Sequence, residues 1–184
     1  DIQEIAKEIG KPAGLFIAAR GTSDNAARYG KYVWGAFNSI PVSLATPSLF
    51  SIYHQPPNLK SQLVIGISQS GESPDLLAVL QEAKQQGAPT LAITNHVSSP
   101  LADTADHIIN IQAGEERAVA ATKTYTAQLL AIAMLSAAWN QTSNQQSDLK
   151  KVPAFAASAL ELEKPIAEFA PRYRYMDQCV VLGR

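Results

Sequence analysis

A run of apolar residues at 63–67 (LVIGI) leads directly into the polar, glycine-containing segment 68–75 (SQSGESPD), and this junction constrains the fold more than any other feature. An uninterrupted aliphatic run is typical of a strand that is buried on both faces. Pro74 suits the first turn of a helix, where its missing N–H is not needed. The sequence therefore predicts a strand, a tight polar turn and a helix N-terminus in immediate succession.

This predicted turn has the chemistry of an anion site. Backbone N–H groups and serine hydroxyls would point toward one place, with the positive end of the helix dipole behind them. We expect the oxyanion held there to be a phosphate group. The alternative is an ordinary strand-to-helix turn in which the serines only cap the helix.

Four further apolar runs alternate with segments of helical pattern. The expected strands, besides 63–67, are 15–20, 41–45, 90–94 and 107–111. The expected helices between and after them are 25–38, 46–55, 74–86, 100–105 and 119–140. This alternation predicts an α/β fold with three α-β-α layers around a five-stranded, parallel, doubly wound sheet. Ligands of such sheets bind beyond the carboxyl ends of the strands.

The domain organisation follows from the same pattern. We expect an N-terminal helix, an α/β domain, connecting helices and a final strand-like segment, at 1–12, 13–145, 146–177 and 178–184. The final segment reads QCVVLGR and echoes LFIAARG at 15–21. Such an echo indicates a repeated unit. We therefore expect a second, similar domain to begin there, and the chain, which starts at Asp1, to be a piece of a longer protein.

The region between the two expected domains is polar at first and helical afterwards. Residues 141–148 are expected to form a loop. A helix is expected over 149–169, broken or kinked near Pro153 and Pro165.

Composition excludes several classes of function. The formal net charge is −1 and no basic run occurs, so we expect no nucleic-acid partner. No segment approaches the roughly 20 consecutive apolar residues that cross a bilayer, so we expect no membrane span. The single cysteine, Cys179, excludes an intrachain disulfide and fits a reducing, cytoplasmic location. We expect Cys179 in the core of a strand rather than as a nucleophile.

Metal and nucleotide signatures are missing from the sequence. His54, His96 and His107 do not have the spacing of metal ligands, and His54 is expected at a surface or interface. Neither G-x-G-x-x-G nor G-x-x-x-x-G-K-[ST] occurs. We expect no metal and no cofactor.

Three motifs resemble the signatures of one known family. They are GTS at 21–23, SQSGES at 68–73 and GEERAVAATK at 114–123, each placed after an expected strand. In this order they resemble the SIS (sugar isomerase) domains. The resemblance covers about residues 13–140. Within the family, this sequence resembles in particular the isomerase half of glucosamine-6-phosphate synthase and the SIS-type glucosamine-6-phosphate deaminases.

The resemblance implies which residues hold a sugar phosphate. The positions that match the family's phosphate and sugar contacts are Ser23, Ser68, Gln69, Ser70 and Ser73. The family often has Thr where Ser73 stands, which keeps the hydroxyl. Gly21 and Thr22 complete the first turn, where Gly21 would allow the ligand to approach the backbone closely.

The third motif carries the remaining candidates. Val119 matches a position whose backbone faces the sugar, while Glu116 and Lys123 match the acidic and basic positions of the signature. The family has two SIS domains in tandem, and its catalytic base lies in the second. We therefore expect the base outside this chain, with Glu116 and Lys123 as weak candidates within it.

Simpler explanations remain open for these charged residues. Glu115 and Glu116 precede a long helix and could only compensate its dipole. Lys123 could form a solvated pair within that helix. Arg20 and Arg28 could steer a phosphate or lie on the surface without a role.

The apolar helix faces also leave two interpretations open. Tyr29, Trp34 and Phe37 recur at helical spacing and are expected in the core or in a dimer face. The apolar stretch 129–139 could supply a homodimer face or pack inside the domain.

The function implied by the resemblance is the binding of fructose 6-phosphate or glucosamine 6-phosphate in an aldose–ketose type amino-sugar phosphate isomerase. A carboxylate would move a proton between C1 and C2. If a glutaminase domain lies upstream, the parent protein would be a glutamine-dependent aminotransferase. If the parent protein consists only of two SIS domains, a deaminase is favoured instead. The alternative is a non-catalytic regulatory domain that senses a sugar phosphate.

Overall fold

The structure is a computed structural model that describes residues 1–118, 120–140 and 143–180. The chain divides into two units, Asp1–Thr142 and Ser143–Arg184, and each is described by itself. Val119, one of the expected sugar contacts, lies outside the described residues.

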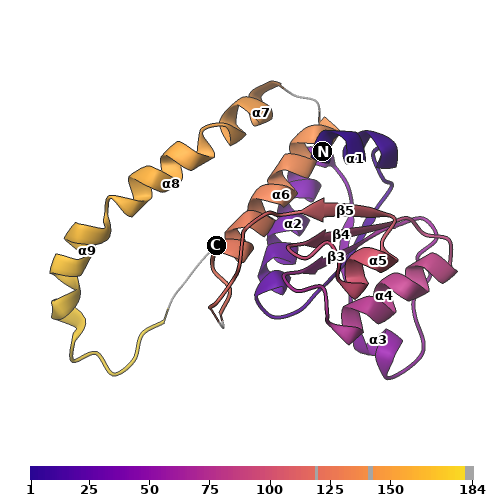
Figure 1. The fold of residues 1–184 in the computed structure, drawn as a ribbon, viewed down its shortest axis with the longest axis horizontal. Coiled ribbons are helices and arrows are strands. Elements are labelled where there is room, and N and C mark those ends of the chain that lie inside the picture. The colour runs from indigo at the N-terminus through magenta and orange to yellow at the C-terminus, as the bar shows by residue number, and fades with distance from the viewer. Residues whose placement is uncertain (119, 141–142, 181–184) are drawn as a thin grey trace. The chain divides into compact units, whose positions relative to one another are not determined.

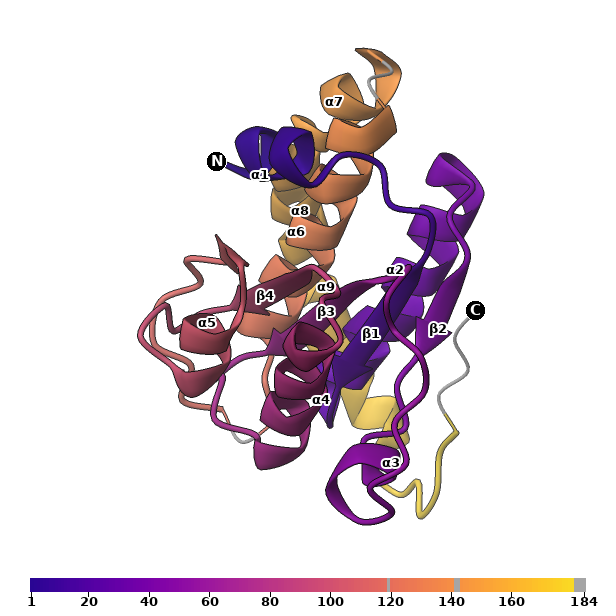
Figure 2. The ribbon, with the colours of Figure 1, turned by 90° about the vertical axis from the view of Figure 1, so that its right-hand side faces the viewer.

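The first unit is built on a parallel sheet with the strand order β2-β1-β3-β4-β5, of which Figure 1 labels β3 to β5 and Figure 2 labels β1 to β4. Its strands are β1 (Leu15–Ala19), β2 (Val42–Leu44), β3 (Leu63–Ser68), β4 (Thr90–Thr94) and β5 (His107–Asn110). In the centre, Ile65 of β3 lies opposite Ile17 of β1 and Leu91 of β4. All five strands agree with the ranges predicted from the sequence to within one residue at each end.

Helices cover both faces of this sheet (Figures 1 and 2). One face carries α1 (Ile2–Ile9), α2 (Thr22–Asn38) and α6 (Lys123–Asn140). The other carries α3 (Ser48–Ser51), α4 (Pro74–Gln85) and α5 (Pro100–Thr104). The predicted three-layer α/β fold is therefore confirmed.

The continuous apolar runs are explained by burial on both faces of the strands. In β3, Leu63 and Ile65 pack into the core under α1, α2 and α6, whereas Val64 between them packs into the core under α3, α4 and α5. Successive strand residues point to opposite faces. A strand covered twice therefore needs apolar side chains at every position, and all six residues of β3 are buried.

The helices α2 and α6 lie against each other, and their packing shows which of the apolar residues that were expected in the core or in a dimer face are buried inside this domain. Trp34 of α2 is fully buried beside Trp139 of α6, with ring centroids 6.1 Å apart, whereas Tyr29 and Phe37 are exposed. Most of the 129–139 stretch is internal, and its exposed large side chains are Leu130 and Met134.

The second unit corrects the expected loop. Residues 143–149 form helix α7 (Ser143–Leu149) where 141–148 was expected to be a loop, so that prediction is wrong over the described part. Residues 141–142 lie outside the described residues. The prediction relied on polarity, but a short polar segment without Gly or Pro can still form a solvent-exposed helix.

The helix expected at 149–169 is interrupted close to its two prolines, as predicted, because the breaks at 150–151 and 161–162 come shortly before Pro153 and Pro165. It consists of α8 (Val152–Leu160) and α9 (Glu163–Phe169), and a 3-10 turn, η1 (Ala170–Tyr173), follows. Pro153 and Pro165 each fall in the first turn of a helix, where the ring breaks no hydrogen bond. No helix in the described ranges is long and apolar enough to cross a membrane.

Cys179 does not lie in a buried strand. It is exposed, and no strand occurs among residues 143–180. The prediction of a core position is therefore wrong within this chain, because a strand is buried only where neighbouring strands and helices cover it. Residues 181–184 lie outside the described residues, so the start of a second domain at 178–184 stays a prediction.

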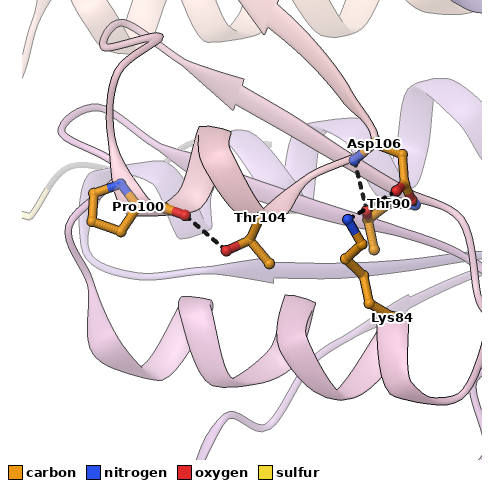
Figure 3. Close-up of polar contacts among 5 residues, drawn as sticks. All are labelled: Lys84, Thr90, Pro100, Thr104 and Asp106. Carbon is orange, nitrogen blue, oxygen red and sulfur yellow. Dashed lines mark hydrogen bonds and ion pairs between the residues drawn. The ribbon is translucent and has the colours of Figure 1, made fainter.

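A polar network joins α4, β4 and β5 at the amino ends of the strands (Figure 3). The Asp106 carboxylate accepts hydrogen bonds from the backbone N–H and the hydroxyl of buried Thr90, at 3.0 and 2.7 Å. The Thr90 hydroxyl in turn accepts one from the Asp106 N–H. Lys84 lies 3.1 Å from the same carboxylate. Partial burial alone would raise the pKa of Asp106, but these contacts outweigh it and lower the pKa.

We expect Asp106→Asn to destabilise the chain by about 1–2 kcal/mol at pH 7, toward the lower end of the roughly 1.5–3 kcal/mol of a hydrogen bond to a charged group because the carboxylate is partly exposed. The lowered pKa makes the ionised form stabilising above the pKa of the unfolded chain, and this contribution is lost as the pH falls through the folded-state pKa. Urea unfolding at pH 7 and pH 3 should thus show a smaller difference between variant and parent at pH 3. Asp103→Asn, at an exposed position of α5, is the control, and an equal loss at both pH values would contradict the assignment.

Candidate functional site

The strand order places the candidate site between β1 and β3. In the order β2-β1-β3-β4-β5 the direction of winding reverses between these two strands. Doubly wound sheets bind ligands beyond the carboxyl ends of the strands at such a reversal. The GTS turn follows β1 and the SQSGES turn follows β3, so the fold brings the two predicted motifs to one edge.

The SQSGES turn is organised by its own serines. Ser68 ends β3 and is buried, and its hydroxyl accepts a hydrogen bond from the Gly71 N–H at 3.0 Å. The Ser70 hydroxyl accepts one from the Glu72 N–H at 3.3 Å. Ser68 and Ser70 therefore shape the turn before any ligand arrives.

Gly71 is required by its surroundings. Its φ is +69°, and a Cβ at this position would overlap the Ser99 side chain. The Gly71 carbonyl accepts a hydrogen bond from the Leu101 N–H at 3.1 Å, so the turn is fixed against the start of α5. A side chain here would push the turn away from α5.

Ser73 and Gln69 provide the polar groups that the turn itself does not use. Ser73 is the N-cap residue of α4, yet its hydroxyl makes no capping hydrogen bond. The expectation that the serines only cap the helix is thus not met at Ser73. The Gln69 backbone carbonyl accepts hydrogen bonds from the Asn95 N–H at 3.2 Å and from the Thr94 hydroxyl at 3.3 Å, and Gln69 also lines a cavity.

The GTS turn begins α2. Gly21 is its N-cap residue with φ +57°, and nothing lies within 4 Å of where a Cβ would stand, so one side of the turn is open. Thr22 is the first helical residue, and Ser23 is buried. The Ser23 hydroxyl accepts a hydrogen bond from Gln128 Nε2 of α6 at 3.0 Å.

Both candidate arginines are engaged in ion pairs. Arg20 lies 3.2 Å from Asp75 in the first turn of α4, and Arg28 lies 2.9 Å from Asp24 within α2. All four side chains are at least one-third exposed, so these pairs add little stability. The Arg20–Asp75 pair does connect the end of β1 with the start of α4.

The third motif follows β5 and leads into α6. Glu116 accepts hydrogen bonds from the N–H groups of Thr122 and Thr124, at 3.0 and 3.2 Å, and from the Thr124 hydroxyl at 3.1 Å. The Thr124 N–H is the main cause of the lowered pKa of Glu116, and the other donors add to it against an opposing effect of desolvation. Glu116 thus stays ionised and caps α6, which explains why the helix begins at Lys123 rather than at 119.

Asn95 was not singled out from the sequence, although it connects two parts of the site. Its carboxamide accepts from the Ala113 N–H at 2.9 Å and donates to the Gly114 carbonyl at 2.7 Å. The third motif is therefore fixed at its start by Asn95 and at its end by Glu116. A polar residue directly after an expected strand, as in TNH at 94–96, was the only available signal.

A polar cavity of about 620 Å³ lies beside these residues, lined by Gln69, Asn95, His96, Asn110, Gln112, Gly114, Glu115 and Glu116. It joins the second motif to the third. Another cavity, of about 410 Å³, lies between α1, β5 and α6 and contains none of the predicted site residues. Among the described residues no cluster of His, Cys, Asp and Glu could hold a metal ion.

The sequence matches the SIS domain family over residues 9–138. The chain belongs to the SIS domain family. This confirms the resemblance drawn from the three motifs.

Individual relatives agree with this assignment. The chain is 36% identical over 193 aligned residues to a glutamine–fructose-6-phosphate aminotransferase of Clostridium acetobutylicum, a match that covers 100% of this chain and 32% of the relative. Among solved structures, a candidate phosphosugar isomerase from Silicibacter pomeroyi has a TM-score of 0.87 at 34% identity, covering 94% of this chain and 54% of that one. The C-terminal domain of glucosamine-fructose-6-phosphate aminotransferase from Francisella tularensis has a TM-score of 0.78 at 29% identity, covering 93% and 50%. The chain thus spans about a third of the length of the curated relatives it matches.

We expect Gly71→Ala to destabilise the chain by roughly 2 kcal/mol or more, because it adds a steric conflict with Ser99 to a left-handed backbone conformation. Thermal unfolding would measure the loss. Gly87→Ala is the matched control, since Gly87 also has a positive φ, +76°, but open space around it. Equal losses in both variants would show that the contact with Ser99 does not matter.

We expect Glu116→Gln to loosen the third motif, because the variant loses the charge and one acceptor oxygen. Amide hydrogen exchange at Thr122 and Thr124 should then be faster at neutral pH. As the pH falls through the lowered pKa of Glu116, the parent should approach the variant. Glu115→Gln is the control, because Glu115 contacts Arg117 at the surface. Unchanged exchange at both threonines would contradict the capping role.

Proposed function

We propose that this chain is the phosphosugar-binding domain of an aldose–ketose type amino-sugar phosphate isomerase, and that residues 68–73 hold the phosphate of fructose 6-phosphate or glucosamine 6-phosphate. The observation that carries the proposal is the preformed turn between β3 and α4 in a member of the SIS domain family. Its Ser73 hydroxyl stands at the N-terminus of α4 without an internal partner among the described residues.

The phosphate would be held by hydroxyls, an amide and a helix end rather than by cations. Ser70, Ser73 and Gln69 offer side-chain groups, and the first turn of α4 contributes backbone N–H groups and its dipole. Ser23 would reach the sugar from the neighbouring turn after β1. A contact of the Val119 backbone with the sugar belongs to this proposal as well, at a position outside the described residues.

The chemistry would be a proton transfer between C1 and C2 of the sugar. A carboxylate can take and return that proton on one face. Glu116 is a poor base in this chain, because its carboxylate accepts hydrogen bonds from the start of α6 and its pKa is lowered. We therefore assign the base to a second SIS domain of the parent protein and give this chain the binding of the substrate's remote end.

The names of the relatives favour an aminotransferase as the parent protein. The curated relatives described above are glutamine–fructose-6-phosphate aminotransferases, and the chain covers about a third of their length. A glutamine-dependent synthase is thus preferred to a deaminase. A sugar-sensing regulatory domain is not favoured by these relatives.

The proposed partners are a second SIS domain and a second copy of the chain. The large apolar side chains Tyr32 and Phe37 are exposed along α2, as are Leu130 and Met134 along α6. A cytoplasmic location is proposed from the single cysteine.

The proposal predicts that fructose 6-phosphate or glucosamine 6-phosphate raises the melting temperature of the 184-residue chain, whereas unphosphorylated fructose does not. Ser73→Ala should weaken binding by about 10–150-fold, the effect of losing one hydrogen bond to a charged group of about 1.5–3 kcal/mol, with little change in stability. Ser70→Ala should also weaken binding and should destabilise the turn. Titration calorimetry and thermal unfolding would measure both.

Ser61→Ala is the matched control, because Ser61 is exposed just before the amino end of the same strand. It should bind like the parent. Equal binding by the parent and both site variants, or no binding of either sugar phosphate, would refute the assignment.

A further inference from the structure

Two buried polar pairs connect α2 with α6, although this interface is otherwise apolar. The residues of α6 at 124, 128, 132 and 136 face inward at a spacing of four, and three of them are polar. Ser136 forms hydrogen bonds with Asn38 of α2, and Gln128 forms one with Ser23. The two pairs differ in where they lie, because only Ser23 belongs to the turn at the carboxyl end of β1.

The Asn38–Ser136 pair is complete, whereas the Ser23–Gln128 pair is not. Ser136 donates its hydroxyl to Asn38, and Asn38 donates to the Ser136 carbonyl. In the other pair, Gln128 is 1% exposed and its Oε1 has no hydrogen-bond partner among the described residues. A buried polar atom without a partner destabilises a fold, so its retention calls for another reason.

The direction of the hydrogen bond decides what Ser23 can offer a ligand. Gln128 Nε2 donates to the Ser23 oxygen at 3.0 Å. A hydroxyl that accepts in this way still carries its own proton and can donate it elsewhere. No described residue accepts a hydrogen bond from the Ser23 hydroxyl, and the turn beside Gly21 is open.

The opposite orientation of the carboxamide is less favourable. In the orientation described, the carbonyl oxygen of Gln128 and one of its two N–H groups have no partner among the described residues. Turning the carboxamide over would instead leave both N–H groups without acceptors. Buried N–H groups without partners are rarer in proteins than carbonyls that lack one. The interface therefore favours Gln128 as the donor and Ser23 as the acceptor.

We propose that Gln128 is a positioning residue that fixes Ser23 as a hydrogen-bond donor toward the bound sugar phosphate. This inference rests on the proposed function. A donor is what an anionic or hydroxyl-rich ligand needs at this edge, and a freely rotating hydroxyl would present the right direction only part of the time. The unpartnered Oε1 then lowers the stability of the fold, and it is kept because Gln128 is needed to position Ser23.

The test is Gln128→Met, which keeps the length and volume of the side chain but can neither donate nor leave a polar atom unpaired. The dissociation constant for fructose 6-phosphate should rise by about 3–10-fold, a typical effect for a neutral hydrogen bond. The melting temperature should stay the same or increase. A purely structural role would give the reverse, a lower melting temperature with unchanged affinity.

A double-mutant cycle with Ser23→Ala makes the test independent of the folding of one variant. Ser23→Ala should weaken binding, and the double variant should bind no more weakly than Ser23→Ala alone, because Gln128 acts through Ser23. Gln128→Leu provides a second apolar replacement with different packing. Ser136→Ala is the matched control, since it removes a hydrogen bond from the same interface far from the turn and should leave the dissociation constant unchanged.

The outcomes separate this inference from the proposed function. If Ser73→Ala weakens binding but Gln128→Met and Gln128→Leu bind like the parent, the positioning role is overturned and the proposed function stands. Additive effects of Ser23→Ala and Gln128→Met would also overturn it. If the parent chain binds neither sugar phosphate, both proposals fall.

Discussion

The burial of β3 on both faces is the constraint on which the rest of the structure depends. All six residues of the strand are buried between two helical layers, with β1 and β4 on either side. In such a strand, polar side chains can reach solvent or a ligand only at the two ends. The chain must therefore change from a wholly apolar strand to a polar turn within one residue, and Ser68 is where it does so. Its hydroxyl closes the turn onto Gly71, which the Leu101 N–H fixes from the neighbouring segment.

The candidate site is assembled by contacts within its turns and by contacts that join one turn to another. The Gln69 carbonyl is fixed by the end of β4, Asn95 holds the start of the third motif, and Glu116 holds its end. The Gln69 contacts join different connections of the sheet, and so do the Asn95 contacts, whereas those of Glu116 lie within the connection from β5 to α6. Loops fixed in this way lose little conformational entropy when a ligand binds, which is the physical basis of preorganisation. The sheet determines that the motifs meet at the carboxyl ends of its strands. The hydrogen bonds of Gln69, Asn95 and Glu116 then determine the positions of the polar groups along this edge.

The sequence predicted what depends on local pattern and missed what depends on distant pairing. Strands such as 63–68 could be predicted because burial on two faces requires an unbroken apolar run, and the GTS and SQSGES turns could be predicted because each follows such a run. Gln128 could not, since its partner Ser23 lies 105 residues away. The α7 helix was missed because a polar segment carries no hydrophobic period. Cys179 was misplaced because apolar neighbours in the sequence do not guarantee covering layers in space.

The two turns have no unpaired arginine beside them in the part of the chain that the structure describes, and this shapes how they could bind a ligand. Arg20 and Arg28 are each paired with a carboxylate, so the ligand-facing groups near the two turns are hydroxyls, carboxamides and a helix end. Such groups bind an oxyanion through directed hydrogen bonds rather than through net charge, so the orientation of each donor is important. A site made of such groups can supply binding energy at the non-reacting end of a substrate. The acid–base groups for the reaction itself must then come from another part of the protein. The lowered pKa of Glu116 fits this division, because a carboxylate that stays ionised to cap a helix is not free to take up a proton. The physical properties of the edge are thus those that the proposed function requires, namely a domain that would hold one end of a substrate while a neighbouring domain performs the chemistry.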